Sequence, residues 1–463
     1  MEDTIPEPND LPEITKLSVC MIVRNEEEAL PRCLQSVESV ANELIVVDTG
    51  SKDRTVSIAK DFGAKLFHFE WCDDFAAARN ESIKNATGDW ILQIDADEEL
   101  DPNSIRWVKS ALLKPSIIAY NAKCDNGPTT LTPRFEWICR LFRRLPGVKY
   151  ERPYHEGVDH SLSNLIRQEP YWQIVREPKI VIRHHGYEGP QLDMKYERGI
   201  KIMMSYAGQH PDDVYMLTRL GSALGGVKRH DEALFYLFRA LEIDSKLPDA
   251  HYSVGLSLQE QQKWDQAIDH YKKAVLLNPE LAEAFSNMGK IFIEKGLLDE
   301  GISIIKKALS INPSLSTAYL NLGVALKNKG LFEDSLRAFK QALHIAPDLA
   351  IGHLNVGSLY HINGQLDQAI ECYKRALQID TKDADAHFNL GISYRHKGMV
   401  NEAIEEYKKA LVINPEHAAA HNNLAITFYG IKKHKNAIKH CDMAIKLGFQ
   451  VHPQFLQDLE VYR

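Results

Sequence analysis

Residues 284–317 read AFSNMGKIFIEKGLLDEGISIIKKALSINPSLST, and residues 318–351 read AYLNLGVALKNKGLFEDSLRAFKQALHIAPDLAI. The two segments follow each other directly and carry glycine, alanine and proline at equivalent positions, 34 residues apart. A period of this length is typical of arrays in which each unit is a pair of helices. The second half of the chain is therefore predicted to be a stack of helix pairs.

Columns of small residues extend this period from about Met216 to the end of the chain. Small side chains at fixed positions let two helices approach closely, and a proline at the end of a unit stops its second helix. The columns are glycine at 221, 255, 289, 323, 357 and 391 with Ala425 in the seventh place; alanine at 240, 274, 308, 342, 376, 410 and 444; Ala233, Ala267, Gly301, Ser335, Ala369, Ala403 and Ala437; and proline at 279, 313, 347 and 415.

These columns resemble those of the tetratricopeptide repeat, and seven units fit into residues 216–449. The resemblance implies an all-α solenoid. We expect residues 196–215 to form a linker helix. Residues 450–463 are expected to cap the last unit, because the end of a solenoid must cover an apolar face.

Asparagine forms a further column, two residues before the glycine position of five units. In a stack of repeats this column becomes a ladder of carboxamides, and each amide can bond to the backbone of an extended peptide. The ladder resembles the one in the repeat groove of O-linked N-acetylglucosamine transferases, which implies a polypeptide partner. The alternative is that these amides bond only within or between helices. The asparagines are Asn287, Asn321, Asn355, Asn389 and Asn423.

The first half of the chain lacks this period and alternates short apolar runs with helical stretches. Such an alternation indicates a parallel sheet with helices on both faces. The predicted strands are residues 17–24, 43–48, 64–69 and 90–95, and the predicted helices are residues 26–37, a segment ending near residue 62, and residues 74–86.

Polar clusters follow three of the predicted strands. They are Arg24-Asn25-Glu26, Asp48-Thr49-Gly50-Ser51 and Asp95-Ala96-Asp97. Ligands of parallel α/β sheets bind beyond the carboxyl ends of the strands. We therefore expect the three clusters to converge on one edge of the sheet and to form a binding site there.

Four motifs in the first half occur in an order that resembles the family-two nucleotide-sugar glycosyltransferases, which have the glycosyltransferase A fold. The resemblance implies an α/β, Rossmann-like enzyme domain over residues 16–195, followed by the tetratricopeptide-repeat solenoid. The motifs are SVCMIVRNEEEALPRCLQSV (18–37), ELIVVDTGSKDRT (43–55), DDFAAARNESI (73–83) and GDWILQIDADEEL (88–100).

The family's aspartate motif falls on Asp95 and Asp97. Two carboxylates one residue apart at a strand end suit a hard divalent cation that bridges a diphosphate. We expect Mn²⁺ or Mg²⁺, with Asp97 as a direct ligand and Asp95 near the ribose or a metal-bound water. His184 and His185 follow an apolar strand and are expected to complete the ligand set, although strand alternation permits only one of them to point inward.

An acidic turn that caps the helix after Pro102 is the alternative reading of this region, and Glu98 and Glu99 suit that capping role.

The remaining motifs are expected to bind the sugar nucleotide. The resemblance implies that Asp48 binds the uracil and ribose, since its carboxylate can accept from the uracil N–H. It implies that Arg79 approaches the base or the diphosphate. The alternative for Arg79 is an exposed ion pair with Asp73 or Asp74. The residues expected to bind the donor are Val23, Asn25, Glu26, Asp48, Arg79 and Asp95.

An inverting transfer needs a general base for the acceptor's proton. Related enzymes carry a His-Glu pair where this chain has His155-Glu156. Glu156 is the expected base, with His155 as the alternative. Arg140, Arg143 and Arg144 are expected to line a solvated edge rather than to contact phosphate.

Length, charge and composition exclude several classes of protein. A chain of 463 residues exceeds one compact core, and its formal charge of −8 disfavours a nucleic-acid binder. Apolar runs are of strand length, so no membrane span is expected. Residues 1–15 are acidic and rich in proline, unlike a signal peptide, and are expected to form a flexible leader. Seven scattered cysteines without a CxxC pair suit reduced thiols in the cytoplasm.

The leading hypothesis is an inverting, metal-dependent transferase that moves a sugar, with N-acetylglucosamine as the expected one, from a UDP-sugar to Ser or Thr of a polypeptide held by the repeats. The combination resembles bacterial transferases that modify flagellin. Transfer to Cys of a peptide, and transfer to a lipopolysaccharide or other glycan with the repeats as an assembly scaffold, stay open as alternatives, as does oligomer formation. A binding scaffold with a decayed enzyme domain is disfavoured by the intact acidic pair.

Overall fold

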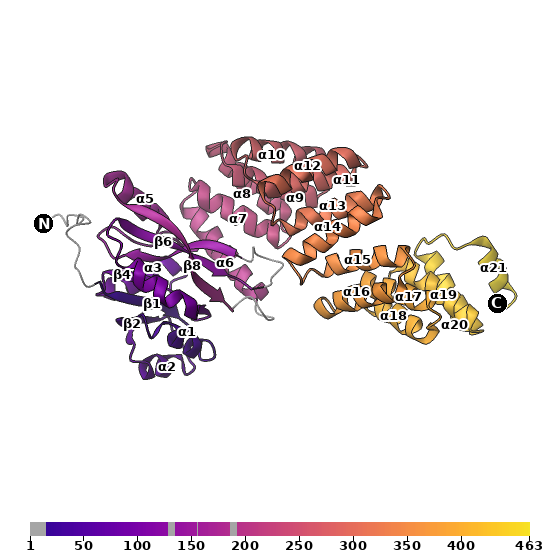
Figure 1. Cartoon of the computed structure of the whole chain (residues 1–463), viewed down its shortest axis with the longest axis horizontal. Coiled ribbons are helices and arrows are strands. Elements are labelled where there is room, and N and C mark those ends of the chain that lie inside the picture. The colour runs from indigo at the N-terminus through magenta and orange to yellow at the C-terminus, as the bar shows by residue number, and fades with distance from the viewer. Residues whose placement is uncertain (1–14, 128–134, 155, 186–191) are drawn as a thin grey trace. The chain divides into compact units, whose positions relative to one another are not determined.

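The computed structural model describes residues 15–127, 135–154, 156–185 and 192–463 of the chain. The chain divides into two compact units, Met1–Ser245 and Lys246–Arg463. The first unit contains a β-sheet with its covering helices, and the second is entirely helical (Figure 1).

The first four strands of the sheet are parallel, as the alternation of strands and helices predicted. β1 lies between β2 and β4 and is parallel to both, and β3 pairs with the outer side of β2. β2 coincides residue for residue with the predicted strand. The strands are β1 (Leu17–Val23), β2 (Glu43–Asp48), β3 (Lys65–His68) and β4 (Trp90–Gln93), and the helices that connect them are α1 (Leu30–Val37), α2 (Thr55–Asp61) and α3 (Phe75–Asn85).

The second half of the sheet departs from the predicted parallel arrangement. The strand order is β3-β2-β1-β4-β7-β6-β8-β5, in which β7 is antiparallel to β4 and to β6, and β5 is antiparallel to β8. Only residues 126–134 separate β6 from β7, too few for a crossover helix, so the two strands pair antiparallel. These strands are β5 (Glu98–Leu100), β6 (Ile117–Asp125), β7 (Phe135–Arg143) and β8 (Gln173–His184).

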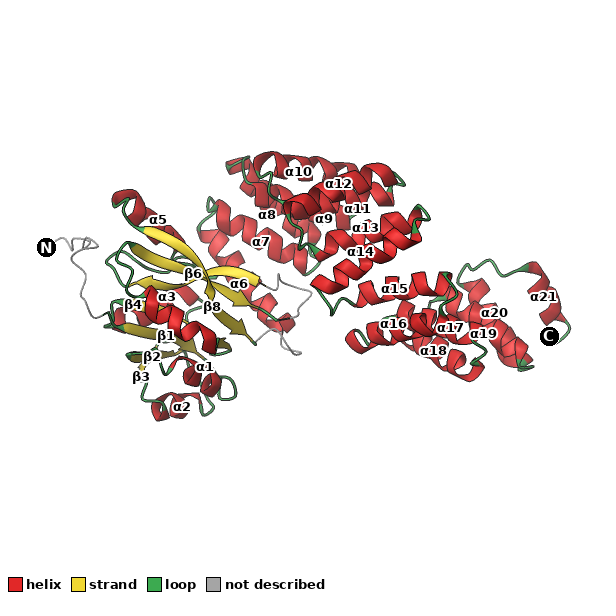
Figure 2. Ribbon diagram, in the orientation of Figure 1, coloured by secondary structure: helices red, strands yellow, loops and turns green. Residues whose placement is uncertain are grey.

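Helices cover both faces of the sheet (Figure 2). Alternate residues of a strand point to opposite faces. Val19 and Met21 of β1 therefore pack with α1, α2 and α4 (Ile105–Ala111), whereas Cys20 packs with α3 and α5 (Asp159–Gln168). The two buried cores hold the strands rigidly, so the loops at the strand ends start from fixed positions.

The first helix pair of the repeat region belongs to the same compact unit as the sheet. It follows α6 (Leu192–Gln209) and consists of α7 (Val214–Gly226) and α8 (His230–Ile243). Asp213 caps the N-terminus of α7 and also accepts from Arg152 Nε at 2.9 Å. A half-buried ion pair thus ties the first pair to the α/β domain.

The second unit consists of six helix pairs and a terminal helix, α21 (Pro453–Glu460), which buries Leu459 in the apolar cluster of the last pairs. None of the helices in the described part of the chain is long and apolar enough to cross a bilayer. The pairs are α9 (Pro248–Glu260) with α10 (Trp264–Leu277), α11 (Ala282–Glu294) with α12 (Leu298–Ile311), α13 (Ser316–Asn328) with α14 (Phe332–Ile345), α15 (Ala350–Ile362) with α16 (Leu366–Ile379), α17 (Ala384–His396) with α18 (Val400–Ile413), and α19 (Ala418–Gly430) with α20 (His434–Lys446).

The glycine column marks the place where the two helices of a pair come closest. A Cβ atom on Gly323 would lie 2.5 Å from the ring of Phe339 in the second helix of the same pair, and one on Gly255 would lie 2.5 Å from the ring of Tyr271. These distances are too short for real contacts. The sequence period therefore reflects a steric requirement at the helix–helix contact.

We expect Gly323→Ala to lower the free energy of unfolding by about 1–3 kcal/mol, because the added methyl group overpacks the contact with Phe339. Gly430→Ala is the matched control: a Cβ there would meet nothing within 4 Å, and alanine favours the helix by up to about 1 kcal/mol. Urea unfolding of both variants measures the difference. Equal stability of the two would contradict the packing role of the column.

Candidate active site

Three loops meet at one edge of the sheet. They follow β1, β2 and β4, which are neighbours in the order β2-β1-β4 and run in the same direction. Their carboxyl ends therefore lie side by side, as expected for a ligand site in a parallel α/β sheet.

The loop after β1 is fastened to the loop after β2. The N–H of Asn25 donates to Ser51 Oγ at 3.0 Å, and Asn25 Oδ1 accepts from the N–H of Lys52 at 2.8 Å. The N–H of Glu26 donates to Thr55 Oγ1 at 2.7 Å. Asn25 has a φ of 57°, a left-handed conformation that asparagine tolerates. Asn25 and Glu26 thus fix the shape of this edge through their backbone and, for Asn25, through its amide oxygen.

Asp48 ends β2 and is buried. Its carboxylate accepts from the N–H groups of Gly50 at 3.2 Å and Ser51 at 3.0 Å. Val23 lies beside it at the end of β1, with its side chain in the core and its carbonyl accepting from the N–H of Thr49. The turn that follows β2 therefore orients the Asp48 carboxylate, while Val23 is placed to act through the backbone only.

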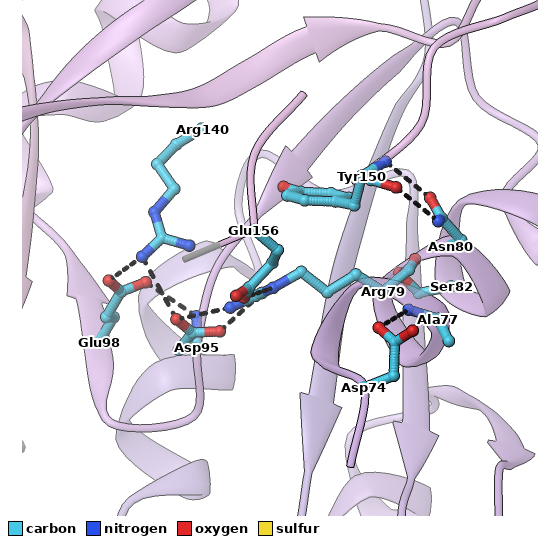
Figure 3. Close-up of polar contacts among 10 residues, drawn as sticks. All are labelled: Asp74, Ala77, Arg79, Asn80, Ser82, Asp95, Glu98, Arg140, Tyr150 and Glu156. Atoms are coloured by element: carbon cyan, nitrogen blue, oxygen red, sulfur yellow. Dashed lines mark hydrogen bonds and ion pairs between the residues drawn. The ribbon is translucent and has the colours of Figure 1, made fainter. Parts of the chain in front are cut away.

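Arg79 connects two of the acidic residues predicted for the site (Figure 3). It projects from α3 and is buried, with Nη1 donating to Asp95 Oδ1 at 2.8 Å and Nε donating to Glu156 Oε1 at 2.7 Å. Asp95 follows β4, and Glu156 lies in the segment before α5. One guanidinium group therefore holds carboxylates from two separate parts of the domain.

The alternative reading of Arg79, an exposed ion pair with Asp73 or Asp74, is wrong. Asp74 caps α3 by accepting from the N–H of Ala77 at 2.9 Å, and Asp73 accepts from Trp71 Nε1 at 2.7 Å. Both carboxylates are engaged near the start of the helix, whereas Arg79 lies more than a turn further on and points into the sheet edge.

Arg140 was expected on a solvated edge, and the structure corrects this. Its side chain is buried, and Nη2 donates to Glu98 Oε1 at 2.5 Å and to Asp95 Oδ2 at 3.3 Å (Figure 3). Arg143 is buried as well, and its guanidinium donates to the backbone carbonyls of Ile117 and Lys114. Arg140 lies in the middle of β7, where an arginine within the apolar run ICRLF is itself a signal of a buried ion pair.

The alternative reading, in which Glu98 caps a helix, does not hold for this residue. It lies on β5, which pairs with β8, and its Oε2 accepts from the N–H of Asp95 at 2.8 Å. The following 3₁₀ turn is capped instead by Asp101, whose carboxylate accepts from the N–H of Asn103. Because β5 pairs with β8, Glu98 lies in the interior of the domain. Its position shortly before Pro102 in the sequence therefore did not indicate a helix cap.

The electrostatics of this network keep Asp95 ionised. Burial raises the pKa of Asp95, but the guanidinium groups of Arg79 and Arg140 outweigh burial and hold the pKa well below the usual range. Burial raises the pKa of Glu98 to about 7; Arg140 acts in the opposite direction, and the charge of Asp95 adds to the rise. Asp95 is thus a carboxylate anion that accepts hydrogen bonds from both arginines.

Asp97 lies beside the end of β8. Its Oδ2 is 3.6 Å from Nε2 of His184, whereas Nε2 of His185 lies 3.2 Å from Glu99 Oε2. The N–H of His185 also donates to the backbone carbonyl of Asp97 at 2.9 Å. Of the two histidines, His184 is the one next to Asp97.

The residues present suit a hard divalent cation that is completed by its substrate. Within the described ranges, no group of three or more His, Cys, Asp or Glu side chains is arranged to hold a metal ion. Cations such as Mg²⁺ are, however, commonly held by one or two carboxylates together with diphosphate oxygens and water. Asp97 and His184 form such a partial ligand set, whereas both oxygens of Asp95 already accept from arginine.

His155, the alternative to Glu156 as base, lies outside the described residues.

The asparagine column lies in the first helices of successive pairs, and part of its hydrogen-bonding capacity is used inside the array. Asn287 donates to Tyr252 Oη at 3.3 Å, and Asn321 donates to Ser286 Oγ at 3.1 Å, each partner belonging to the preceding pair. The buried Asn355 donates to the carbonyl of Ile351. These bonds use amide N–H groups of Asn287 and Asn321, whose amide oxygens accept no hydrogen bond from the part of the chain that the structure describes.

We expect Arg140→Met to lower the free energy of unfolding of the first unit by about 3–5 kcal/mol, because it leaves the buried Glu98 without its cation and Asp95 with Arg79 alone. Arg32→Met replaces an exposed arginine of α1 and should change stability by no more than about 0.5 kcal/mol. Urea denaturation of the two variants, followed by tryptophan fluorescence, provides the comparison. A similar small effect in both would show that Arg140 is not needed to hold the site together.

Comparison with known proteins places these features in context. The model of the glycosyl transferase family 2 matches residues 18–175. Models described as TPR repeat match residues 255–296, 357–398 and 393–431, and a tetratricopeptide repeat model matches residues 282–315 and 316–349.

Three relatives illustrate the range of similarity. An uncharacterized glycosyltransferase of Rickettsia bellii is 35% identical over 236 residues, which cover 49% of this chain and 76% of that protein. The glycosyltransferase SunS of Bacillus phage SPbeta is 29% identical over 264 residues, covering 54% of this chain and 58% of SunS. A TPR repeat-containing protein of Synechococcus elongatus is 46% identical over 213 residues, covering 46% of this chain and 53% of that protein. The chain thus matches little more than half the length of the last two.

Proposed function

The chain belongs to the family-two glycosyltransferases and carries tetratricopeptide repeats, and on this premise we propose that it transfers a sugar from a uridine-diphosphate donor to a polypeptide. That it is a glycosyltransferase follows from the family. The donor nucleotide, the cation, the base and the acceptor are argued below as proposals.

We propose that the donor binds at the edge formed by the loops after β1, β2 and β4. The Asp48 carboxylate accepts from Gly50 and Ser51, and His68 Nδ1 lies 3.2 Å from its Oδ2. A carboxylate has about four acceptor sites, so one remains for the uracil N–H. Val23, Asn25 and Glu26 would form the adjoining wall, mainly by shaping the backbone.

Asp97 and His184 would hold the divalent cation, with Asp95 further away near the ribose or a metal-bound water. The Asp97 carboxylate and the diphosphate oxygens are ligands that suit Mn²⁺ or Mg²⁺, and His184 would add one nitrogen ligand. When bound, the cation would neutralise the charge that develops on the leaving diphosphate. Arg79, which is held between two carboxylates, would stabilise the same negative charge from the protein side.

Glu156 would act as the general base. In the transfer its carboxylate takes the proton of the acceptor hydroxyl while the hydroxyl oxygen forms a bond to the anomeric carbon. The bond between that carbon and the diphosphate oxygen breaks, and UDP leaves with the electron pair. Attack from the side opposite the leaving group inverts the anomeric configuration.

The single observation that carries this proposal is the bridge made by Arg79. It joins Asp95, on the donor side, to Glu156, the candidate base, through hydrogen bonds of 2.8 and 2.7 Å. The base and the donor-side carboxylate are therefore within the span of one guanidinium group, which is the closeness that direct transfer between two bound substrates requires.

The acceptor is proposed to be a polypeptide, modified on Ser or Thr. Support comes from the amide oxygens that Asn287 and Asn321 retain after their bonds within the array, since backbone N–H groups of an extended chain can donate to them. N-acetylglucosamine is the proposed sugar and flagellin the first acceptor to test. A Cys acceptor would use the same base to remove a thiol proton.

We propose that catalysis resides in residues 16–195 and acceptor binding in residues 216–449, joined by the linker 196–215, with residues 1–15 as a leader and 450–463 as a cap. The first helix pair would then serve both parts, since it has the repeat period but belongs to the compact unit Met1–Ser245.

Incubation of the chain with radiolabelled UDP-N-acetylglucosamine, UDP-glucose or UDP-galactose, Mn²⁺ and a bacterial lysate tests the proposal. We expect a labelled protein band that disappears on protease treatment and when EDTA replaces Mn²⁺. Label that enters only lipid or glycan fractions would overturn the polypeptide acceptor.

A further inference from the structure

Three successive first helices of the second unit carry a cationic or protonatable side chain at the same repeat position. These are Lys327 of α13, His361 of α15 and Arg395 of α17, which we call the cationic column. The equivalent positions of neighbouring repeats are uncharged: they hold Gln259, Ile293 and Tyr429. At this repeat position, cationic side chains thus occur only in the units that contain α13, α15 and α17.

The two cations of the column, Lys327 and Arg395, lack an anionic partner among the residues that the structure describes. Neither Lys327 nor Arg395 forms an ion pair with any residue that the structure describes. Lys327 is half-buried, and its ammonium group donates to the neutral amide oxygen of Asn355 at 3.3 Å. The Nε–H of Arg395 is buried and meets no hydrogen-bond acceptor within the described ranges. Partial burial of a cation without an anion is unfavourable, so an anionic ligand would stabilise this arrangement.

Several other charged residues of these repeats form ion pairs, unlike Lys327 and Arg395. Lys397 pairs with Asp367, Lys329 pairs with Asp299, and His417 lies 3.2 Å from Asp385. Asp299, Asp367 and Asp385 are therefore engaged with other cations. No described carboxylate forms an ion pair with Lys327 or Arg395, so a bound ligand would supply the anion.

His361, in the middle of the cationic column, contacts side chains of the following repeat. His361 Nδ1 lies 2.8 Å from Ser393 Oγ, and its ring packs on that of His396 with centroids 4.9 Å apart. Burial, together with His396, lowers the pKa of His361. His361 is thus a neutral hydrogen-bonding group between two cations rather than a third charge.

The cationic column adjoins the asparagine ladder, because Lys327 Nζ contacts Asn355 directly. Packed helices lie about 8–10 Å apart, and an extended polypeptide advances by about 3.3–3.6 Å per residue. A chain that runs along the array thus passes one repeat for roughly every three residues. Carboxylates spaced by about three residues, or by multiples of three, would meet successive positions of the column.

We propose that the cationic column binds the carboxylates of an acidic, extended polypeptide segment, and that this segment is part of the acceptor. The proposal rests on the proposed function for the identity of the acceptor, but the binding surface itself does not depend on it. The overall charge of −8 disfavours a nucleic acid, for which positive charge would have to cover a larger surface.

Fluorescence anisotropy with the full chain tests this inference. The probes are two labelled peptides of equal length, (Ser-Gly-Glu)₅ and (Ser-Gly-Gln)₅. We expect the glutamate peptide to bind at least about tenfold more tightly, since each charge-assisted hydrogen bond is worth roughly a factor of ten. K327Q/R395Q should abolish this preference. K382Q/K435Q, which removes two exposed lysines and changes the net charge equally, should preserve it.

Equal affinity for the two peptides, an unchanged preference in K327Q/R395Q, or tighter binding of a fifteen-nucleotide thymidine oligomer would each overturn the inference. Sugar transfer is measured separately. A preserved peptide preference without transfer to any protein refutes the proposed function alone. Transfer with an unchanged KM for the protein acceptor in K327Q/R395Q refutes the cationic column alone.

Discussion

Replacing Asp97 by asparagine should lower the rate of sugar transfer by roughly three orders of magnitude, because the cation on the leaving diphosphate would lose its charged protein ligand. The fold should survive the change. The backbone carbonyl of Asp97, which accepts from the N–H of His185 at 2.9 Å, is kept in the variant, and asparagine has the shape of aspartate. The loss is therefore expected in activity and not in stability.

Transfer and donor hydrolysis, both measured across a range of Mn²⁺ concentrations, check this expectation. Asp61→Asn is the matched control, since Asp61 is an exposed residue at the end of α2. High Mn²⁺ should restore part of the lost activity if the remaining ligand, His184, still binds the ion. Unchanged kinetics in Asp97→Asn would show that the cation, if one is used, is held elsewhere.

Replacing Glu156 by glutamine should reduce kcat by about 10²–10⁴-fold while the affinity for UDP changes little, because the amide cannot take the acceptor's proton. The oxygen of glutamine can still accept from Arg79 Nε, so the bridge between the two sides of the site would persist. A fall in kcat without a change in the affinity for UDP distinguishes a base from a residue that only supports the fold.

Isothermal titration with UDP and single-turnover transfer measure the two quantities. Glu70→Gln replaces an exposed glutamate of the same unit and should leave both unchanged. A kcat within about threefold of the wild type in Glu156→Gln would remove Glu156 from the chemistry. A large loss in His155→Gln instead would assign the base to the neighbouring residue.

Sequence patterns predicted the parallel half of the sheet well, because strands buried on both faces are continuous apolar runs. β2 was located to the residue. The helix expected from residue 26 begins at Leu30, since residues 25–27 are committed to hydrogen bonds with the next loop. The antiparallel strands β6 and β7 were missed, because the motif set that indicated the fold ends before them and their order in the sheet depends on tertiary pairing.

The sequence predicted the acidic residues of the candidate site more fully than its arginines. Arg79 lies in a recognisable motif, whereas Arg140 lies outside one and was assigned to the surface from its charge. Its burial depends on Glu98, which in turn depends on the pairing of β5 with β8, a contact between distant segments. The choice between His184 and His185 likewise required the structure, since both follow the same strand.

Intact-mass spectrometry of an acceptor incubated with the chain and a UDP-sugar tests the central claim most directly. Flagellin and an acidic, serine-rich polypeptide are the acceptors to compare, with Asp97→Asn as the inactive control. We expect the active chain to add one or more whole sugar masses to the polypeptide, with Mn²⁺ required, and the variant to add none. An acceptor that keeps its mass while sugar accumulates on a lipid or glycan would contradict the account.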